Sequence, residues 1–306
     1  MDLRLFLQSH NIEYKARECV SRLSFVGIGG SVTLVTYPKD RGQLLCLLSY
    51  LVSNSIPYKV VGYMSNVLPP DGEWGICLIC TRRIRSIYFE KNQTVAECGV
   101  SLSALCRAML KEGLVPPVEL FGIPATVGGA VYQNAGAFDL SVSDRILSVD
   151  FYDPRFDRVV KKDRGELAFS YRRSSVVNEG IVLSAAISCG AGSARDAAEK
   201  MDALGCRRRQ SQPHGPSLGS VFLRVNGVSA AYYIERAGLK GRRIGGAVVS
   251  SKHAGFIVNA GGATAEDYRA LVDLVEAEVR DQFQLSLQKE IEIINTKEKY
   301  QWLHFA

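Results

Sequence analysis

A glycine-rich passage constrains this chain more than any other feature of its sequence. Residues 119–138 have the sequence ELFGIPATVGGAVYQNAGAF, in which glycines at 122, 128, 129 and 136 stand among small side chains. Glycine adopts backbone conformations that other residues avoid, and it lets a ligand approach the main chain closely. The passage therefore predicts a ligand-binding loop rather than one regular helix or strand.

Two other loops, Gly62–Asn66 and Pro216–Ser220, also carry serine or asparagine beside glycine. Ordinary tight turns explain one such loop easily but three of them less well. Backbone N–H groups in loops of this kind can point at phosphate oxygens. Gly27-Ile28-Gly29-Gly30 is not a dinucleotide-binding fingerprint, because valine stands where its third glycine would fall and the glycines precede a predicted strand.

The remaining pattern mixes helices and strands. Residues 32–67 predict a strand–helix–strand unit, whose helix begins after Asp40 and ends at Asn54. Prolines and glycines at 210–219 indicate a loop or a domain boundary. The elements predicted beyond residue 70 are strands at 76–80, 84–89, 94–98, 146–153, 181–187, 221–225 and 285–294, and helices at 102–112, after Ser193, after Ser229 and from Thr264.

Composition is that of a globular chain with about two domains. Of its 306 residues, 47% are hydrophobic and 22% charged, which excludes a disordered or low-complexity protein. The apolar runs are far shorter than the ~20 residues that cross a bilayer, and the N-terminus lacks the features of a secretory signal. We therefore expect a cytoplasmic protein. Cys77 and Cys80 lie in an apolar run that predicts a buried strand, so we expect no metal site.

The net charge is +6, and the arginines and lysines form short clusters such as Arg207-Arg208-Arg209. Such clusters are most often solvated surface, although they also attract phosphate-bearing small molecules or nucleic acid. Composition alone does not decide between these interpretations.

Four segments, in order along the chain, resemble the bacterial UDP-N-acetylenolpyruvoylglucosamine reductases, the MurB family. Residues 122–138 are similar to the flavin-binding signature of that family. Residues 62–71, with the pattern Gly-x-x-Ser-Asn-x-Leu-x-x-Asp, are similar to its second flavin loop. The other matching segments are 212–222 and 234–259.

The resemblance implies an α+β protein with a two-subdomain FAD-binding fold of the PCMH or vanillyl-alcohol-oxidase type, followed by a smaller α+β substrate-binding domain. We expect the FAD-binding subdomains at 1–70 and 71–210, and the substrate-binding domain at 211–306. No tyrosine-bearing insertion stands between Leu167 and Gln210, so the chain resembles the shorter subtype of the family.

The implied activity is the NADPH-dependent reduction of the enolpyruvyl ether of UDP-N-acetylglucosamine to UDP-N-acetylmuramate, a cytosolic step of peptidoglycan synthesis. The implied cofactors are FAD and NADPH, and the implied partner is the UDP-sugar substrate. We expect a monomer that binds neither nucleic acid nor membrane.

By the same resemblance, Arg172 stabilises the substrate carboxylate, Ser220 protonates the carbon next to it, and Glu290 stabilises the enol-like intermediate. Spacing alone favours a surface arginine for Arg172 and a turn residue for Ser220. Alternation along 285–294 places Glu290 and Glu292 on one polar face, so Glu292 is the alternative to Glu290.

Other residues are implied to surround the cofactor or the substrate. The cofactor-binding candidates are Gly62, Ser65, Asn66, Gly122, Ile123, Thr126, Gly128, Gly129, Asn134 and Gly136. The substrate-binding candidates are Tyr171, Arg208, Arg224, Lys252 and His253. The chain departs from the family at Met64, where glycine is usual, and at Leu223-Arg224, where lysine and asparagine are common.

Two other functions remain open from the sequence. One is a flavin oxidase of the same fold superfamily, which would differ in the C-terminal segment that carries Ser220 and Glu290. The other is a nucleic-acid-binding protein, which would interleave aromatic and basic residues on one face. The basic clusters of this chain lack that pattern.

Overall fold

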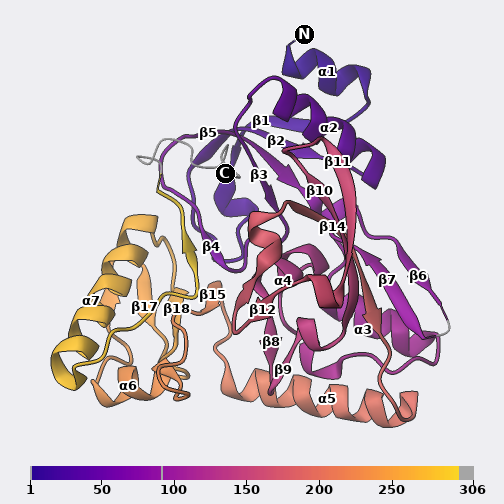
Figure 1. The fold of residues 1–306 in the computed structure, drawn as a ribbon. Helices are drawn as coiled ribbons and strands as arrows, with labels where there is room; N and C mark the ends of the chain where they lie inside the picture. Colours follow the sequence, from indigo (N-terminus) through magenta and orange to yellow (C-terminus); the bar gives the residue numbers. More distant parts are fainter. Residues whose placement is uncertain (1, 91, 296–306) are drawn as a thin grey trace.

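Three larger β-sheets, of four, five and four strands, follow one another along the described chain, each with helices of its own (Figure 1). The computed structural model describes residues 2–90 and 92–295. The helices are α1 (Leu3–Ser9), α2 (Arg41–Ser53), α3 (Leu102–Lys111), α4 (Val127–Gln133), α5 (Ala194–Ser211), α6 (Ala230–Arg236) and α7 (Ala265–Phe283).

The first sheet contains the predicted strand–helix–strand unit. Its strands, in spatial order, are β1 (Glu13–Cys19), β2 (Ser31–Tyr37), β5 (Trp74–Cys80) and β3 (Tyr58–Val61). β2 and β3 are both parallel to β5, which lies between them. The Asp40 carboxylate caps α2 by accepting the Gln43 N–H at 2.8 Å. Cys77 and Cys80 are buried in β5, as predicted, and β5 extends the sheet beyond the boundary expected at residue 70.

The second sheet is antiparallel. Its strands, in spatial order, are β11 (Arg158–Asp163), β10 (Ile146–Asp153), β14 (Ile181–Ser188), β7 (Gln93–Glu97) and β6 (Ile87–Phe89). Side chains of α3 and α4 share one buried apolar cluster with this sheet. The long helix α5 runs along the lower edge of the molecule in Figure 1 and leads into the third sheet.

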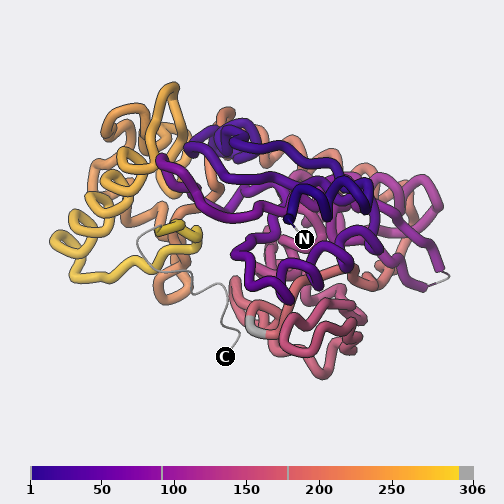
Figure 2. Tube along the Cα trace, turned by 90° about the horizontal axis from the view of Figure 1, so that it is seen from above, coloured from indigo at the N-terminus to yellow at the C-terminus, as the bar shows by residue number. Residues whose placement is uncertain are grey.

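The third sheet and its helices form a lobe to one side of the other two sheets (Figure 2). Its strands, in spatial order, are β15 (Ser217–Ser220), β18 (Phe256–Asn259), β17 (Ala247–Val249) and β16 (Arg243–Ile244). Helices α6 and α7 contribute to its core, which also contains Val26, Ile28 and Leu68 from the N-terminal part of the chain. The lobe therefore packs directly against the region of the first sheet.

After α7, the chain returns to the first part of the molecule. The short strand β19 (Glu292–Ile293) pairs in parallel with β4 (Val67–Leu68), and Ile294 is buried in the core below the first sheet. The predicted strand at 285–294 was wrong over most of its length, because only this short part finds a partner strand. The predicted strand at 221–225 was also wrong, since the strand occupies Ser217–Ser220 and is followed by isolated bridges.

The glycine-rich passage contains a helix that the sequence did not predict. Thr126 caps α4 by accepting the Gly129 N–H at 3.3 Å. A side chain at Gly128 would lie 3.0 Å from the Cβ of Cys98, so glycine allows the helix to approach β7 closely. Glycine is a poor helix former, and packing overrides that preference here. Among the described residues, every helix is too short or too polar to cross a lipid bilayer.

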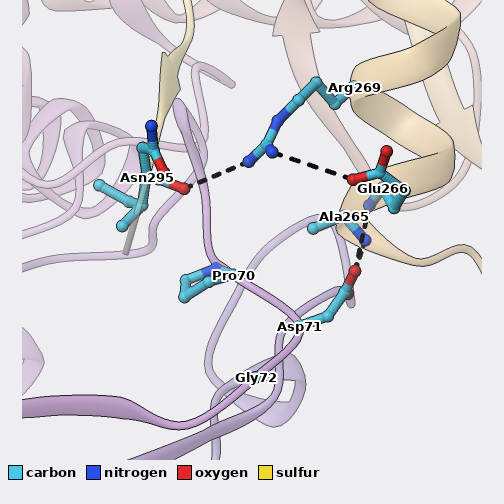
Figure 3. Close-up of a pocket in the computed structure, with 8 residues that line it drawn as sticks. Pro70, Asp71, Gly72, Ala265, Glu266, Arg269 and Asn295 are labelled. Carbon is cyan, nitrogen blue, oxygen red and sulfur yellow. Dashed lines mark hydrogen bonds and ion pairs between the residues drawn. The ribbon is translucent and has the colours of Figure 1, made fainter. Parts of the chain in front are cut away.

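The first turn of α7 is capped from another part of the chain. The Asp71 carboxylate accepts the N–H groups of Ala265 at 2.6 Å and of Glu266 at 3.0 Å (Figure 3). The side-chain oxygen of Thr264 accepts the N–H group of Asp267 at 3.0 Å. These groups have no partner within a helix, and a carboxylate also complements the positive end of the helix dipole. Asp71 therefore joins the lobe to the loop that follows β4.

We expect Asp71→Ala to lower the free energy of unfolding by about 1–2 kcal/mol, because N–H groups at the start of α7 lose their acceptor. Urea unfolding followed by circular dichroism measures this change. The matched control is Asp202→Ala, which removes an exposed carboxylate from α5. Equal stability of the two variants would contradict the capping role of Asp71.

Candidate functional site

Arg172 and Glu290 form an ion pair although 118 positions separate them in the chain. Arg172 Nε donates to Glu290 Oε1 at 2.9 Å, and the two side chains are only 17% and 15% exposed. Arg172 lies between β12 (Phe169–Ser170) and β13 (Arg173–Ser174), with φ at +56° in the left-handed region. The two residues implied to act on the substrate carboxylate are therefore brought together.

Main-chain oxygens just after α4 hold the Arg172 guanidinium. Its Nη2 donates to Gly136 O at 2.6 Å, and its Nη1 lies 3.5 Å from Asn134 O. A guanidinium has five N–H donors. Within residues 2–90 and 92–295, these two bonds and the one to Glu290 use three of the donors, which leaves two for a substrate carboxylate.

Glu290 is held by its main chain beside the segment that carries Ser220. Its N–H donates to Val221 O at 2.8 Å, and its carbonyl accepts the side-chain amides of Asn66 at 3.0 Å and Gln133 at 3.2 Å. Val221 directly follows Ser220, so the three implied catalytic residues belong to one neighbourhood. The sequence analysis did not single out Gln133, and only its position between candidates in the glycine-rich passage hinted at a role.

Ser220 lies at the end of β15, where space is open. The preceding residue, Gly219, has φ at +74°, and a side chain added there would meet no atom within 4 Å. Glycine is therefore required by the backbone conformation rather than by crowding. Ser220 itself is half-buried and pairs with Phe256 of β18.

The structure separates Glu290 from its alternative, Glu292. Glu292 Oε1 accepts a hydrogen bond from Lys59 Nζ at 2.6 Å, so this carboxylate joins β19 to β3. Burial raises the pKa of Glu290 above its ordinary value, and the nearby Arg172 opposes that effect. Glu290 lies against Arg172 whereas Glu292 is bound by Lys59, so the geometry favours Glu290 as the candidate.

The raised pKa of Glu290 makes stability depend on pH. The stability linked to this group is fully present below the pKa of the unfolded chain and is lost as pH rises through the higher pKa of the folded protein. We therefore expect the free energy of unfolding of the wild type, relative to that of Glu290→Gln, to fall as the pH rises above the ordinary pKa of glutamate. Urea unfolding at several pH values checks this. The control, Glu73→Gln, changes an exposed carboxyl, and a wild-type curve parallel to that of Glu290→Gln would contradict the expectation.

The two predicted flavin loops are in contact with each other. A side chain at Gly62 would lie 2.4 Å from Thr126 Oγ1, so glycine is required for their close approach. Arg82 Nε donates to Gly62 O at 2.8 Å, which stabilises the conformation of this loop. Met64 occupies the position where the family usually has glycine. It has φ at +52°, a conformation that favours glycine, and its buried side chain packs in the core of the first sheet.

The other cofactor candidates differ in their exposure, and Asn134 is buried. Asn134 follows α4 in the left-handed conformation. Its Nδ2 donates to Ser170 O at 2.8 Å, and its Oδ1 accepts the Ser143 N–H at 3.2 Å. Gly122 has φ at +81° and lies against Arg208, where a side chain would come within 3.2 Å of Nε. Ser65 and Ile123 lie in the same two loops and are half-buried.

Arg208, from α5, lies against the glycine-rich passage at residues 122–138. Its Nε is buried with no hydrogen-bond partner among the described residues, and its guanidinium lies 5.3 Å from the ring centre of Phe138. Burial lowers the pKa of Arg208. A buried cation with unused donors is suited to an anionic ligand such as a diphosphate.

The remaining substrate candidates are spread more widely. Tyr171 is exposed beside Arg172, with 4.9 Å between its ring centre and the guanidinium. Lys252 Nζ donates to Arg209 O at 2.7 Å, at the end of α5. Burial lowers the pKa of His253, whose Nδ1 accepts the Gly255 N–H at 3.2 Å. Arg224 is exposed in the loop after β15, so the described contacts do not join it to the Arg172–Glu290 pair.

A pocket of about 390 Å³ lies elsewhere, between the start of α7 and the end of the chain's described part (Figure 3). Its described lining includes Asp71, Arg269 and Asn295, and none of the predicted site residues. The Asp71 carboxylate in its wall is already bound to α7. We therefore assign the functional site to the Arg172–Glu290 region.

Comparison with known proteins decides the family. Residues 32–155 match the family model of an FAD binding domain, and residues 210–294 match that of the UDP-N-acetylenolpyruvoylglucosamine reductase C-terminal domain. UDP-N-acetylenolpyruvoylglucosamine reductase of Caldicellulosiruptor bescii is 38% identical over 298 residues, covering 96% of this chain and 95% of the relative. The chain belongs to the UDP-N-acetylenolpyruvoylglucosamine reductase family. The C-terminal match favours this family over the flavin oxidases that the sequence left open.

Further relatives agree with the family assignment. The reductase of Lactobacillus acidophilus is 34% identical and covers 95% of this chain and 98% of its own length. Among solved structures, the reductase (MurB) from Thermus caldophilus has a TM-score of 0.78 and 28% identity, covering 93% of this chain and 99% of that one. The predicted α+β FAD-binding fold is thereby confirmed. The domain boundaries and the roles of single residues remain predictions.

Proposed function

We propose that this chain is an NADPH-dependent flavoprotein, a UDP-N-acetylmuramate dehydrogenase, that reduces UDP-N-acetylglucosamine enolpyruvate to UDP-N-acetylmuramate in peptidoglycan synthesis. The observation that carries the proposal is the Arg172–Glu290 pair, held beside Ser220 in a chain of this family. The reaction adds a hydride to the methylene carbon of the enolpyruvyl group and a proton to the adjacent carbon. Negative charge builds up at the carboxylate end between these two events.

The residues present fit FAD. Gly62 and Thr126 bring two glycine-containing loops into contact, and Gly122 and Gly129 are exposed along their surface. The buried Arg208 Nε lacks a partner among the described groups, which suits it to the FAD pyrophosphate or to the substrate diphosphate. When bound, FAD supplies the redox chemistry that carries hydride from NADPH to the double bond. The protein supplies position, charge and the proton.

Arg172 and Glu290 are suited to the carboxylate end of the substrate. The two unused N–H donors of Arg172 can bind a carboxylate in a bidentate manner. The guanidinium is already held by Gly136 O and Glu290, so it needs little reorganisation as charge develops. Glu290, paired with this guanidinium, is the residue proposed to stabilise the enol-like intermediate.

Ser220 is the proposed proton donor. A serine hydroxyl is a weak acid in water, but a strongly basic carbon accepts its proton when the two atoms are aligned. Ser220 is half-buried at the end of β15, and its hydroxyl is the group proposed to reach the carbon that is protonated. Because Ser220 and Glu290 are joined through Val221, the donor and the charge-stabilising pair keep a fixed relation to each other.

We also propose that the protein works as a monomer in the cytoplasm, where NADPH and nucleotide sugars are made. Its arginine clusters are partly used within the fold, which argues against a nucleic-acid surface. Arg82 binds Gly62 O and Leu23 O, and Arg83 forms two bonds of 2.7 Å with Glu13.

Purified protein tests the proposal. It should be yellow, and under anaerobic conditions NADPH should bleach the flavin once. Continued oxidation of NADPH should require the enolpyruvyl UDP-sugar, with UDP-N-acetylmuramate as the product. Colourless protein that retards nucleic acid in a gel would contradict the proposal. Flavin-containing protein that oxidises a hydroxy acid instead would favour the oxidase alternative.

A further inference from the structure

Two side-chain amides from different parts of the fold converge on the main-chain carbonyl of Glu290. Asn66 Nδ2 lies 3.0 Å from this oxygen and Gln133 Nε2 lies 3.2 Å from it. Asn66 precedes β4, whereas Gln133 is the last residue of α4. Since a carbonyl oxygen has two lone pairs, the two amides fill its acceptor capacity. The main chain of Glu290 is therefore fixed from two sides.

The end of α4 also holds the partner of Glu290. The carbonyls of Asn134 and Gly136, immediately after Gln133, accept the Arg172 guanidinium. One short segment thus fixes both members of the ion pair, one through a side chain and the other through main-chain oxygens. The segment that carries Glu290 has little regular structure of its own, since β19 begins only at Glu292. External hydrogen bonds therefore determine where the Glu290 carboxylate lies.

We propose that Gln133 is a positioning residue, whose side-chain amide holds the main chain of Glu290 so that its carboxylate meets Arg172 and the substrate. This inference rests on the proposed function. Gln133 acts through Glu290, because its amide donates to the Glu290 main chain. Asn66, the other donor, is itself a predicted FAD-binding residue, whereas Gln133 is not one of those candidates although it lies in the glycine-rich passage.

Gln133→Met tests the role because methionine has a similar length and no amide donor. We expect reoxidation of the reduced enzyme by the enolpyruvyl UDP-sugar to slow about tenfold, since small misplacements of catalytic groups are costly. Reduction by NADPH should stay within about twofold of the wild type, because it does not use Glu290. The matched control is Gln282→Met on α7. The amide of Gln282 donates to Glu278, and this exposed substitution should leave both rates unchanged. Equal slowing of both half-reactions by Gln133→Met would overturn the proposal.

A double-mutant cycle separates positioning from a general structural effect. In a Glu290→Ala background, Gln133→Met should slow reoxidation by less than about twofold, since the group that it positions is gone. A second loss of about tenfold in that background would overturn the proposal, because Gln133 would then act independently of Glu290.

Amide hydrogen exchange gives a readout that does not depend on turnover. We expect faster exchange in a peptide covering residues 285–295 of Gln133→Met, and no change there in Gln282→Met. Unchanged exchange in Gln133→Met would contradict the hydrogen bond on which the proposal rests. Wild-type protein that is never reoxidised by the sugar nucleotide would contradict the proposed function, whereas an active wild type with an unaffected Gln133→Met would contradict only this inference.

Discussion

Ser220→Ala is expected to slow reoxidation of the reduced enzyme by the enolpyruvyl UDP-sugar by about 10²–10⁴-fold, the range typical of a lost general acid. Bleaching of the flavin by NADPH should remain close to the wild-type rate, because that step needs no proton from Ser220. Anaerobic stopped-flow absorbance measures the two half-reactions separately. The alanine side chain fits the half-buried end of β15, so the fold should be preserved.

Ser286→Ala is the matched control, because it removes an exposed hydroxyl from the segment that leads to Glu290. It should leave both half-reactions unchanged. A Ser220→Ala enzyme that loses both half-reactions equally would show that Ser220 has a structural role. A Ser220→Ala enzyme with both rates unchanged would show that Ser220 is not the proton donor.

Arg172→Ala is expected to slow the substrate half-reaction by about 10²–10³-fold, the cost typical of removing one group that stabilises charge in a transition state. The variant loses the two N–H donors proposed for the substrate carboxylate. It also leaves Glu290 without the cation that lowers its pKa, so the pKa of Glu290 should rise further. Stopped-flow reoxidation measures the rate effect, and NADPH reduction serves as the internal reference.

Arg173→Ala is the control for this variant, since the neighbouring arginine is exposed on β13. Arg172→Lys should fall between the wild type and Arg172→Ala, because lysine keeps the charge but not the planar arrangement of donors. If Arg172→Ala turned over at the wild-type rate, Arg172 would not stabilise charge in the reaction.

The parts of the fold predicted best from the sequence are those fixed by local chemistry. Thr264 and Asp267 form the capping box expected at the start of α7, and Asp40 caps α2 as predicted. The errors arise where tertiary contacts prevail. Alternating side chains at 285–294 reflect alternating burial of an extended segment, not a long strand, because partner strands are absent along most of it in the described structure.

In the candidate site too, features set by local sequence could be predicted, whereas those set by tertiary contacts could not. The glycine-containing loops could be recognised because positive φ values and close approach leave a signature in residue type. Spacing gave no hint that Arg172 and Glu290 form a pair, since the fold joins segments far apart in sequence. The choice between Glu290 and Glu292 depended on Lys59, which binds Glu292 from β3. Gln133 was missed because its role depends on a main-chain carbonyl, which leaves no signature in the sequence.

A crystal structure of the protein with FAD and the enolpyruvyl UDP-sugar bound tests the central claim most directly. The account predicts the Arg172 guanidinium and the Glu290 carboxyl at the substrate carboxylate, with Ser220 Oγ within hydrogen-bonding reach of the carbon that is protonated. An enolpyruvyl group bound far from all three side chains, with the sugar nucleotide otherwise well ordered, would contradict it.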